Sequence, residues 1–438
     1  MQTLVQLQNG ELKGATSLTL AEGLSHFPEE IFELADTLER LDLSYNNLSA
    51  LPTDFGRLKK LKIFFCSENP FTVLPEVLAD CPLLDIAGFK ANQIATVPSK
   101  SLNPNLRWLI LTNNRIADLP ATIGNCKKMQ KLMLAGNQLT TLPQELSNCS
   151  NLELLRISAN RLSELPLWLL HMPRLSWLAF SGNPFCAIPS AQSLDLIHWD
   201  DLDLNEHLGE GASGVIHKAT WRNVTETPEV AIKIFKGAVT SDGSPEDEMN
   251  TCVAAGAHPG LVQLIGQITA HPEDKKGLVM GLIPPSFYNL GLPPSLQSCT
   301  WDVFKEGLSL TTPQIVKIAV TIASVALQLH NRGIMHSDMY AHNTLVDDDA
   351  NTLFGDFGAA CFYDKNNSDL APALERLEVR AFGCLLDDLL NLSSEQSNDT
   401  QAKLGIIRDA CMVQDVLLRP DFRYLNDELL KLQLTNPR

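Results

Sequence analysis

The sequence predicts an α/β protein in two parts: a solenoid of short parallel strands with an irregular or helical convex side, followed by a bilobal α+β domain. Two observations carry this prediction. An asparagine recurs at a nearly constant interval through the first half of the chain, and a glycine-rich turn followed by three polar motifs occupies the second half. At 438 residues the chain exceeds one ordinary core, so two domains are expected.

Composition narrows the classes of function. Hydrophobic residues make up 45% of the chain and charged residues 19%, which is a normal globular balance. A net charge of −17 argues against a nucleic-acid partner, which would require clustered Lys and Arg. No basic segment followed by an apolar run opens the chain, and no 18 consecutive residues are apolar. We therefore expect a cytoplasmic protein with no membrane span.

The cysteines indicate packing. The ten cysteines include no CxxC pair, and Cys81, Cys126 and Cys149 fall at one phase of the repeating pattern. We interpret these three as a small buried residue that recurs in a stack, with disulfides as the minority alternative.

The recurring asparagine defines a repeat. Its intervals are 23, 23, 22, 23, 23 and 23 residues, and the positions are Asn46, Asn69, Asn92, Asn114, Asn137, Asn160 and Asn183. Apolar residues lie five and three positions before each asparagine and two after it, and each copy continues with an apolar-Pro pair, as in LILTNNRIADLP. The alternation before the asparagine predicts a short strand, and stacked asparagines are expected to form a ladder of amides that satisfies backbone groups.

This frame resembles the leucine-rich repeat. An earlier copy, SLTLAEGLSHFP, lacks the asparagine and is interpreted as a degenerate capping repeat, which gives about eight repeats over residues 1–190. A short junction over residues 191–202 then leads into the second domain, residues 203–438.

The resemblance places function on the concave face, where the strand residues six and four positions before each asparagine point outward. The middle of this face is apolar, and an exposed apolar area indicates an interaction site. We expect a protein or peptide partner there, or alternatively the second domain or another copy of the chain. The predicted partner-binding residues are Phe65, Trp108, Ile110, Met133, Arg156 and Trp177.

The second half opens with a glycine-rich turn. Gly209, Gly211 and Gly214 form G-x-G-x-x-G, in which glycines let backbone N–H groups approach a phosphate. The motif also fits dinucleotide-binding folds or an ordinary turn. Its surroundings predict strand–turn–strand, and this disfavours the dinucleotide fold.

Three further motifs follow in order. VAIK places Lys233 in an apolar strand, IMHSDMYAHNTLV has the spacing H-x-D-x-x-x-x-N with Asp338 and Asn343, and LFGDFGAA contains Asp356. Each motif alone is modest, but four in this order indicate phosphoryl transfer. From about Leu202 onward the chain resembles the eukaryotic-type protein kinases, and as a whole it resembles bacterial kinases that carry leucine-rich repeats.

The resemblance implies an ATP- and Mg²⁺-dependent mechanism. Lys233 would hold the phosphates, Asn343 and Asp356 would bind Mg²⁺, and Asp338 would accept or orient the substrate hydroxyl's proton. Lys233 needs a carboxylate partner, for which we choose Glu248 over Glu246 and Asp247. The remaining predicted ATP-binding residues are Leu208, Gly209, Glu210, Gly211, Ala212, Ser213, Gly214, Val215, Ala231 and Met280.

The substrate side departs from the family. Ser337 replaces the arginine of the HRD motif, and Tyr340 stands where serine/threonine kinases carry a lysine that His342 could partly replace. Only nineteen residues lie between Gly358 and Glu378, which occupies the place of a helical aspartate.

No APE motif follows the DFG motif. Pro372–Glu375 is its candidate remnant, with Glu375 as a candidate partner for Arg419.

The sequence thus favours a protein kinase, with serine or threonine preferred over tyrosine as acceptor and with repeats that recruit a partner. A nucleotide-gated scaffold (a pseudokinase) and a small-molecule phosphotransferase of kinase-like fold are the alternatives.

Overall fold

The computed structural model describes residues 2–186, 194–211, 213–222, 229–237, 239–240, 242–395 and 398–435. It divides into two compact units, one of Met1–Leu175 with Asn183–Phe185 and one of Ser176–Gly182 with Cys186–Arg438. The predicted boundary at residue 190 and this division differ in the short segment Ser176–Gly182, which belongs to the second unit.

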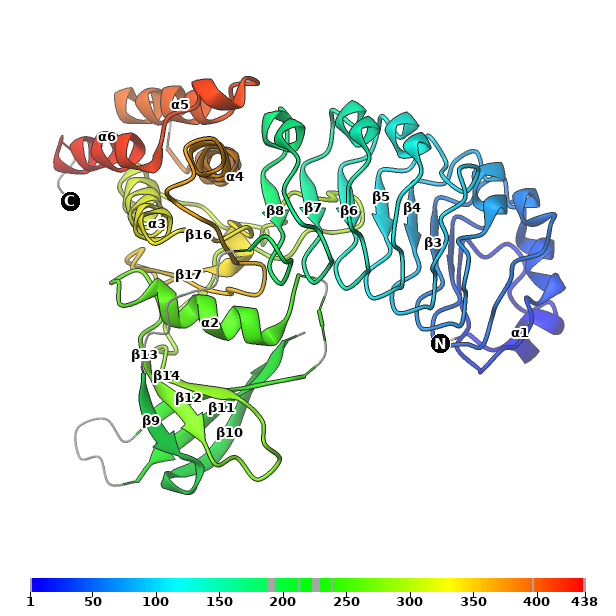
Figure 1. The fold of residues 1–438 in the computed structure, drawn as a ribbon, viewed down its shortest axis with the longest axis horizontal. Coiled ribbons are helices and arrows are strands. Elements are labelled where there is room, and N and C mark those ends of the chain that lie inside the picture. The colour runs from blue at the N-terminus through cyan, green and yellow to red at the C-terminus, as the bar shows by residue number, and fades with distance from the viewer. Residues whose placement is uncertain are drawn as a thin grey trace. The chain divides into compact units, whose positions relative to one another are not determined.

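The repeats form three-residue strands that pair in parallel, one strand per repeat (Figure 1). The register advances by one repeat at each step, so that Leu109 lies beside Leu132. A short helix, α1 (Leu4–Gln8), precedes the strands and is capped by Thr3. The strands are β1 (Ser17–Thr19), β2 (Arg40–Asp42), β3 (Ile63–Phe65), β4 (Ile86–Gly88), β5 (Trp108–Ile110), β6 (Lys131–Met133), β7 (Leu154–Arg156) and β8 (Trp177–Ala179).

Single turns of 3₁₀ helix follow most of the strands. Most of them begin directly after a proline, which restricts φ, and η2 begins after Asp54. They are η1 (Glu29–Leu34), η2 (Phe55–Arg57), η3 (Glu76–Asp80), η4 (Ala121–Asn125), η5 (Gln144–Asn148) and η6 (Leu167–His171).

The predicted ladder of amides is confirmed. Asn137 Nδ2 donates to the carbonyl oxygens of Leu111 and Leu134, each at 2.9 Å, and its Oδ1 accepts from the Ile116 N–H at 3.0 Å. The amide therefore joins two successive repeats and satisfies backbone groups that burial removes from water. β1 lacks this asparagine, as expected of a degenerate first repeat.

The recurring cysteines pack as predicted. Cys81, Cys126 and Cys149 are buried, and the thiol of Cys149 donates to the Ile123 carbonyl at 3.2 Å. Burial raises the pKa of the Cys149 thiol to about 11. A neutral thiol facing the preceding repeat is a packing group.

The predicted concave recognition surface is only partly exposed. Phe65, Trp108 and Ile110 are half-buried, as a surface with a partner-binding role would require. Met133 is 8% exposed and Arg156 is 2% exposed, so the prediction that these two side chains face a partner is wrong. Trp177 is 1% exposed and contacts Met339 within the second unit, so partner binding is wrong for this residue and the alternative prediction, contact with the second domain, is confirmed.

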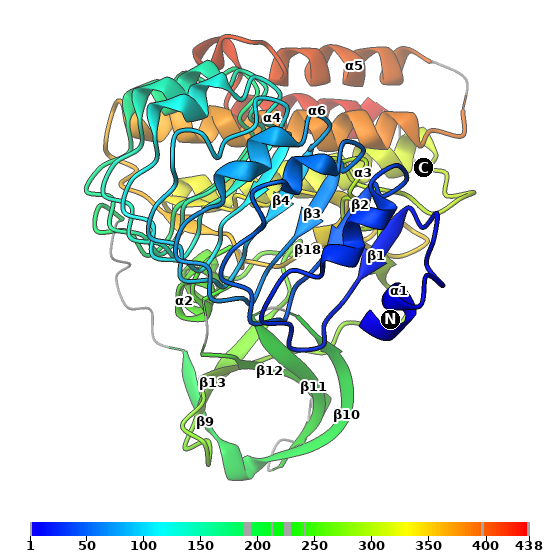
Figure 2. The ribbon, with the colours of Figure 1, turned by 90° about the vertical axis from the view of Figure 1, so that its right-hand side faces the viewer.

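The second unit contains a six-stranded sheet whose strand order is β10-β11-β12-β14-β13-β9. It curves strongly in Figure 2. Its strands are β9 (Asp195–His198), β10 (Leu202–Glu210), β11 (Gly214–Trp221), β12 (Glu229–Phe235), β13 (Leu264–Thr269) and β14 (Gly277–Gly281). The 3₁₀ turn η7 (Trp199–Asp201) joins β9 to β10. β9 pairs in parallel with β13, so the predicted junction over 191–202 contains an edge strand of this sheet.

One helix accompanies the sheet. α2 (Pro245–Ala255) begins where the Ser244 side chain accepts from the Glu246 N–H and where Pro245 occupies the first turn. It ends at Gly256, whose φ of 66° is readily adopted by glycine.

The rest of the second unit is mainly helical, with four helices gathered together in Figure 1. They are α3 (Thr312–Asn331), α4 (Leu370–Asn391), α5 (Asp399–Cys411) and α6 (Phe422–Thr435). Gly383 allows α5 to approach α4, because a Cβ there would lie 2.8 Å from the Cys411 Cβ. The short elements are β15 (Tyr288–Asn289), β16 (Ile334–Met335), η8 (Ala341–Asn343), β17 (Thr344–Val346), β18 (Thr352–Phe354), β19 (Cys361–Phe362) and η9 (Val416–Leu418).

α3 is the most apolar long helix of the part of the chain that the structure describes. By length and composition it could cross a membrane, with a mean hydropathy of 1.4 over its 18-residue window. However, 61% of that window is buried inside the protein, and α3 packs against α6. Such burial is what the core helix of a folded domain shows.

Candidate active site

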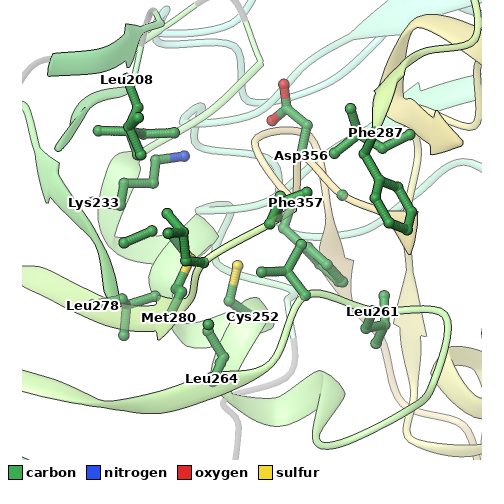
Figure 3. Close-up of a pocket in the computed structure, with 18 of the residues that line it drawn as sticks. Leu208, Lys233, Cys252, Leu261, Leu264, Leu278, Met280, Phe287, Asp356 and Phe357 are labelled. Atoms are coloured by element: carbon green, nitrogen blue, oxygen red, sulfur yellow. The ribbon is translucent and has the colours of Figure 1, made fainter. Parts of the chain in front are cut away.

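A cavity of about 760 Å³ lies between the six-stranded sheet and the segments that follow it. Figure 3 shows its apolar walls, which include Leu208, Leu264 and Met280. Ala231 and Met280 are register neighbours on β12 and β14, so they lie side by side on the sheet. An apolar slot with a few charged groups at one side suits a flat heterocycle that carries phosphates.

Lys233 and Glu248 are the charged pair of this cavity. The Lys233 ammonium donates to Glu248 Oε1 from β12 to α2, and the two side chains are 16% and 2% exposed. Burial alone lowers the pKa of Lys233, but attraction to Glu248, the hydrogen bond to it and the charge of Asp356 reverse this and raise it. Lys233 therefore stays cationic inside the cavity.

The carboxylate predicted for this pair is the one that makes it. Glu246 instead pairs with Lys276 at 2.5 Å, with both side chains largely exposed. The Glu248 side chain is buried and its second oxygen, Oε2, has no hydrogen-bond partner among the described residues. An unsatisfied buried carboxylate oxygen beside a cation is a place where a further donor could bind.

The glycine-rich motif forms the turn between β10 and β11, as the strand–turn–strand prediction requires. A Cβ on Gly214 would lie 2.6 Å from the Ile234 carbonyl oxygen, so this glycine is required by packing between strands. At Gly209 and Gly211 a Cβ would meet nothing within 4 Å, so packing does not require glycine at either position.

The other predicted residues of this turn are placed as follows. Glu210 pairs with Lys236 at 2.6 Å, and Val215 lies opposite Glu210 in the strand register. Ser213 accepts the Lys236 N–H through its backbone carbonyl, and Ala212 lies outside the described residues. Of the predicted ATP-binding residues, Leu208, Ala231, Lys233, Glu248 and Met280 line the cavity.

Asp338 and Asn343 face each other on the loop after β16. Asn343 Nδ2 donates to Asp338 Oδ2 at 2.8 Å and to the Asp338 carbonyl at 3.0 Å. This fixes the amide orientation, so that Asn343 Oδ1 is the atom that could bind a cation. The spacing of four residues between Asp338 and Asn343 allows the contact because η8 tightens the chain between them.

A buried carboxylate anchors the start of this loop. Glu378 on α4 accepts from the N–H groups of Ser337 at 2.6 Å and His336 at 3.2 Å, and it contacts His330 Nε2 at 2.8 Å. Burial raises the pKa of Glu378, but the hydrogen bond and charge of His330, the charge of His336 and the Ser337 N–H lower it overall. Ser337 has a φ of 67°, which a non-glycine residue holds only when its surroundings fix it.

Asp356 extends into the cavity while Phe357 is buried beneath it (Figure 3). Asp356 has a φ of 57°, and its Oδ1 accepts the Gly358 N–H at 3.1 Å. Phe357 packs against His336, with ring centroids 5.1 Å apart, and His336 Nε2 contacts the Gly355 carbonyl at 3.0 Å. The aromatic packing thus turns Asp356 toward the ammonium of Lys233.

His342 is held by an aspartate that the sequence analysis did not identify. His342 Nδ1 contacts Asp302 Oδ1 at 2.6 Å, and the His342 N–H donates to Asp302 Oδ2 at 3.0 Å. Burial lowers the pKa of His342, but the hydrogen bond and charge of Asp302 and the charges of Asp338 and Asp356 raise it overall. The fold therefore favours the charged form of His342 near Asp338, which is the form that the suggested substitute for the absent lysine requires.

The segment after Gly358 is as short as the sequence indicates. β19 follows almost at once, and α4 begins at Leu370 and carries Glu378. Pro372–Glu375 lies inside this helix, where Glu375 Oε1 accepts the Phe422 N–H at 2.9 Å. Arg419 donates to the carbonyls of Val413 and Arg376. The candidate remnant therefore joins α4 to the start of α6.

Asp302 and the edge strand β9 are features that sequence reasoning missed. Asp302 stands in no motif, and its role depends on a loop that meets η8 only in the folded chain. β9 spans four residues, which is too short for alternation to reveal.

These contacts bring together the side chains that the resemblance to protein kinases singled out. Residues 202–380 match the family model described as protein tyrosine and serine/threonine kinase. Residues 104–162 and 127–185 match a leucine-rich-repeat model, and residues 37–58 match another. The chain combines leucine-rich repeats with a protein kinase domain.

Several proteins are similar to part of this chain. A probable serine/threonine-protein kinase of Dictyostelium discoideum is 30% identical over 190 residues, which cover 43% of this chain and 11% of that protein. A second one from that organism is 26% identical over 266 residues, covering 52% and 27%. The serine/threonine-protein kinase mos of Gallus gallus is 28% identical over 174 residues, covering 37% and 48%.

Each match spans less than half of the relative's length. Among solved structures, a leucine-rich-repeat protein of Leptospira interrogans is 28% identical, with a TM-score of 0.35, and the match covers 42% of this chain and 53% of that one.

The buried pair yields a stability prediction. Lys233→Met leaves Glu248 buried without its cation and should lower the free energy of unfolding by about 3–5 kcal/mol in urea titrations. Adding Glu248→Leu should recover most of that loss, since the unpaired charge is then gone. Lys236→Met, which removes an exposed pair, should cost less than about 1 kcal/mol. A double variant as unstable as Lys233→Met would contradict this account.

The His342–Asp302 pair yields a pH prediction. Because the folded state raises the pKa of His342, the pair stabilises the protein fully below the unfolded pKa of about 6.5 and loses its effect as the pH rises through the folded pKa. His342→Gln should therefore lower Tm more at pH 6 than at pH 9. His26→Gln, at an exposed histidine of the first repeats, should show no such difference. An equal Tm loss for His342→Gln at both pH values would contradict the prediction.

Proposed function

We propose that this chain is an ATP-dependent protein kinase that phosphorylates a serine or threonine hydroxyl of a protein. The observation that carries the proposal is the convergence of the Lys233–Glu248 pair and Asp356 at one cavity, with Asp338 and Asn343 bonded to each other on the neighbouring loop. The relatives named serine/threonine-protein kinases support serine or threonine as the acceptor.

The residues fit a magnesium nucleotide. Mg²⁺ prefers a carboxylate or two together with phosphate oxygens and water, and Asp356 and Asn343 supply oxygen donors of that kind. The described residues contain no group of three His, Cys, Asp or Glu side chains suited to a dedicated metal cage. When bound, the ion would supply positive charge that offsets the charge developing on the phosphoryl group.

Each protein group then has a defined task. Lys233, kept cationic by Glu248, would hold the α- and β-phosphates, and Leu208, Ala231 and Met280 would enclose the base. Asp338, oriented through Asn343, would accept or direct the proton of the attacking hydroxyl. The raised pKa of His342 would favour a positive charge close to the transferred group.

The short segment between Gly358 and α4 favours a second candidate function. A chain with intact nucleotide contacts and an abbreviated substrate side could be a scaffold that responds to ATP without turnover. We rank it second because Asp338 and Asn343 retain the bonded arrangement that proton transfer uses.

The first experiment separates the two candidates. With labelled ATP and Mg²⁺, the wild-type protein should label itself or a generic acceptor protein, and Asp338→Asn should reduce the rate about 10²–10⁴-fold. Asp349→Asn, at an exposed aspartate shortly after the same loop, should leave the rate unchanged. Equal, negligible rates in the wild type and Asp338→Asn would contradict the kinase, and thermal stabilisation by ATP would then favour the scaffold.

The repeats are proposed to recruit a protein or peptide partner through Phe65, Trp108 and Ile110. The Phe65 ring covers Gly88, where a Cβ would lie 2.6 Å from Phe65 Cδ1, so an apolar shelf extends across neighbouring repeats. Lys131 Nζ lies 4.2 Å from the centre of the Trp108 ring and adds a charge beside it. Half-buried aromatic rings with a cation beside them are typical of binding hot spots.

This surface has its own test. In a selection from a peptide library, the wild-type protein should enrich sequences that Trp108→Glu with Ile110→Glu no longer binds, with Kd raised at least about 10-fold. Asn125→Ala, at an exposed position of η4, serves as the control. Unchanged binding in the double variant would show that the partner lies elsewhere.

A further inference from the structure

The segment Ser176–Gly182, here called the β8 segment, belongs to the second unit although its strand continues the repeating pattern. Its tryptophan occupies the outward position of the repeat frame. In the structure Trp177 is 1% exposed, and its contacts are with the loop that carries Asp338. Burial of so large a side chain against a site loop indicates a role there.

Trp177 contacts the two residues that directly follow Asp338. Its indole Nε1 donates to the Met339 carbonyl at 3.0 Å, and its ring stacks on Tyr340 with centroids 4.4 Å apart and planes 8° apart. The hydrogen bond fixes the peptide after Met339, and the stacking fixes the side chain beyond it. Trp177 thus holds the loop on the C-terminal side of Asp338.

The rest of the β8 segment contacts the elements around this loop. The Phe180 N–H donates to Cys361 Sγ at 3.0 Å, and Cys361 lies opposite Met335 in the β16–β19 pair just before the loop. Arg380 Nη1 on α4 donates to Ser176 Oγ at 2.7 Å, two residues after Glu378. The segment therefore connects α4, β19 and the loop.

Two features of the loop that carries Asp338 make contacts from outside it important. Ser337 holds a φ of 67°, with its Oγ 3.5 Å from the Met335 carbonyl and 3.7 Å from Cys361 Sγ. The segment after Gly358 is also too short to fold over the loop, because α4 begins at Leu370. Glu378 accepts from the N–H groups of the two residues before Asp338, and Trp177 contacts the two residues after it.

We propose that Trp177 is a positioning residue that holds Asp338 in its working orientation. Glu378 and Trp177 fix the loop on the two sides of Asp338, and Asn343 bonds Asp338 itself. The catalytic consequence rests on the proposed kinase activity, whereas the effect on the loop does not. The β8 segment in this way takes the place of an ordered segment that would otherwise follow Gly358.

The experiment compares the full chain with Trp177→Leu and Trp177→Phe by hydrogen exchange and by kinetics. In Trp177→Leu, amides of residues 336–343 should exchange about 10-fold faster or more, while those of α5 stay unchanged. The kcat should fall about 10–100-fold with the KM for ATP within about 2-fold, since misplacement of Asp338 affects the chemical step. Trp177→Phe keeps a stacking ring and should fall between the wild type and Trp177→Leu.

Trp168→Leu, at a half-buried tryptophan in η6, is the matched control and should change neither quantity. Unchanged exchange over 336–343 in Trp177→Leu overturns the proposal, and so does faster exchange with an unchanged kcat. If α5 exchange also rises in Trp177→Leu, the comparison is made on Trp177→Phe, and exchange at 336–343 equal to wild type there overturns the proposal. If the wild type shows no turnover, the proposed function fails, and exchange alone then decides whether Trp177 holds the loop.

Discussion

The buried carboxylate of Glu378 is the contact on which the rest of the site depends. It accepts hydrogen bonds from two successive backbone N–H groups and contacts His330, so a single anion organises the start of the loop from the middle of α4. Without it, the Ser337 N–H would lose its acceptor, and the left-handed backbone conformation of Ser337 would lose a contact that holds it. His336 would then lose its orientation toward Gly355 and Phe357, and the aromatic packing that turns Asp356 into the cavity would be lost with it.

Short sequence patterns predicted much of the fold and part of the candidate site. The spacing of Asn114 and Asn137 predicted both a strand and a hydrogen-bonded amide, because burial allows few other ways to satisfy the backbone of a stacked repeat. Lys233 and Glu248 could be paired in advance because Lys233 stands in a short motif and Glu248 lies ten residues before His258, in a stretch that resembles the same family.

Long-range contacts escaped prediction. Asp302 reaches His342 from forty residues away, with no periodicity or motif to mark it. The repeat pattern places Trp177 at an outward-facing position of its strand. Packing within the second unit nevertheless buries the side chain. A repeat pattern predicts which way a side chain points, whereas what covers that side chain is decided by the three-dimensional fold.

The contacts of the β8 segment within the second unit limit how this architecture can change. Repeats of uniform length can be added or deleted upstream, because each new coil stacks on its neighbour by the same register. The final repeat has no such freedom, since Ser176, Trp177 and Phe180 must match Arg380, Met339 and Cys361 as well as their own strand. Among related chains, the number of repeats should therefore vary, while the last one changes only together with the loop that it supports.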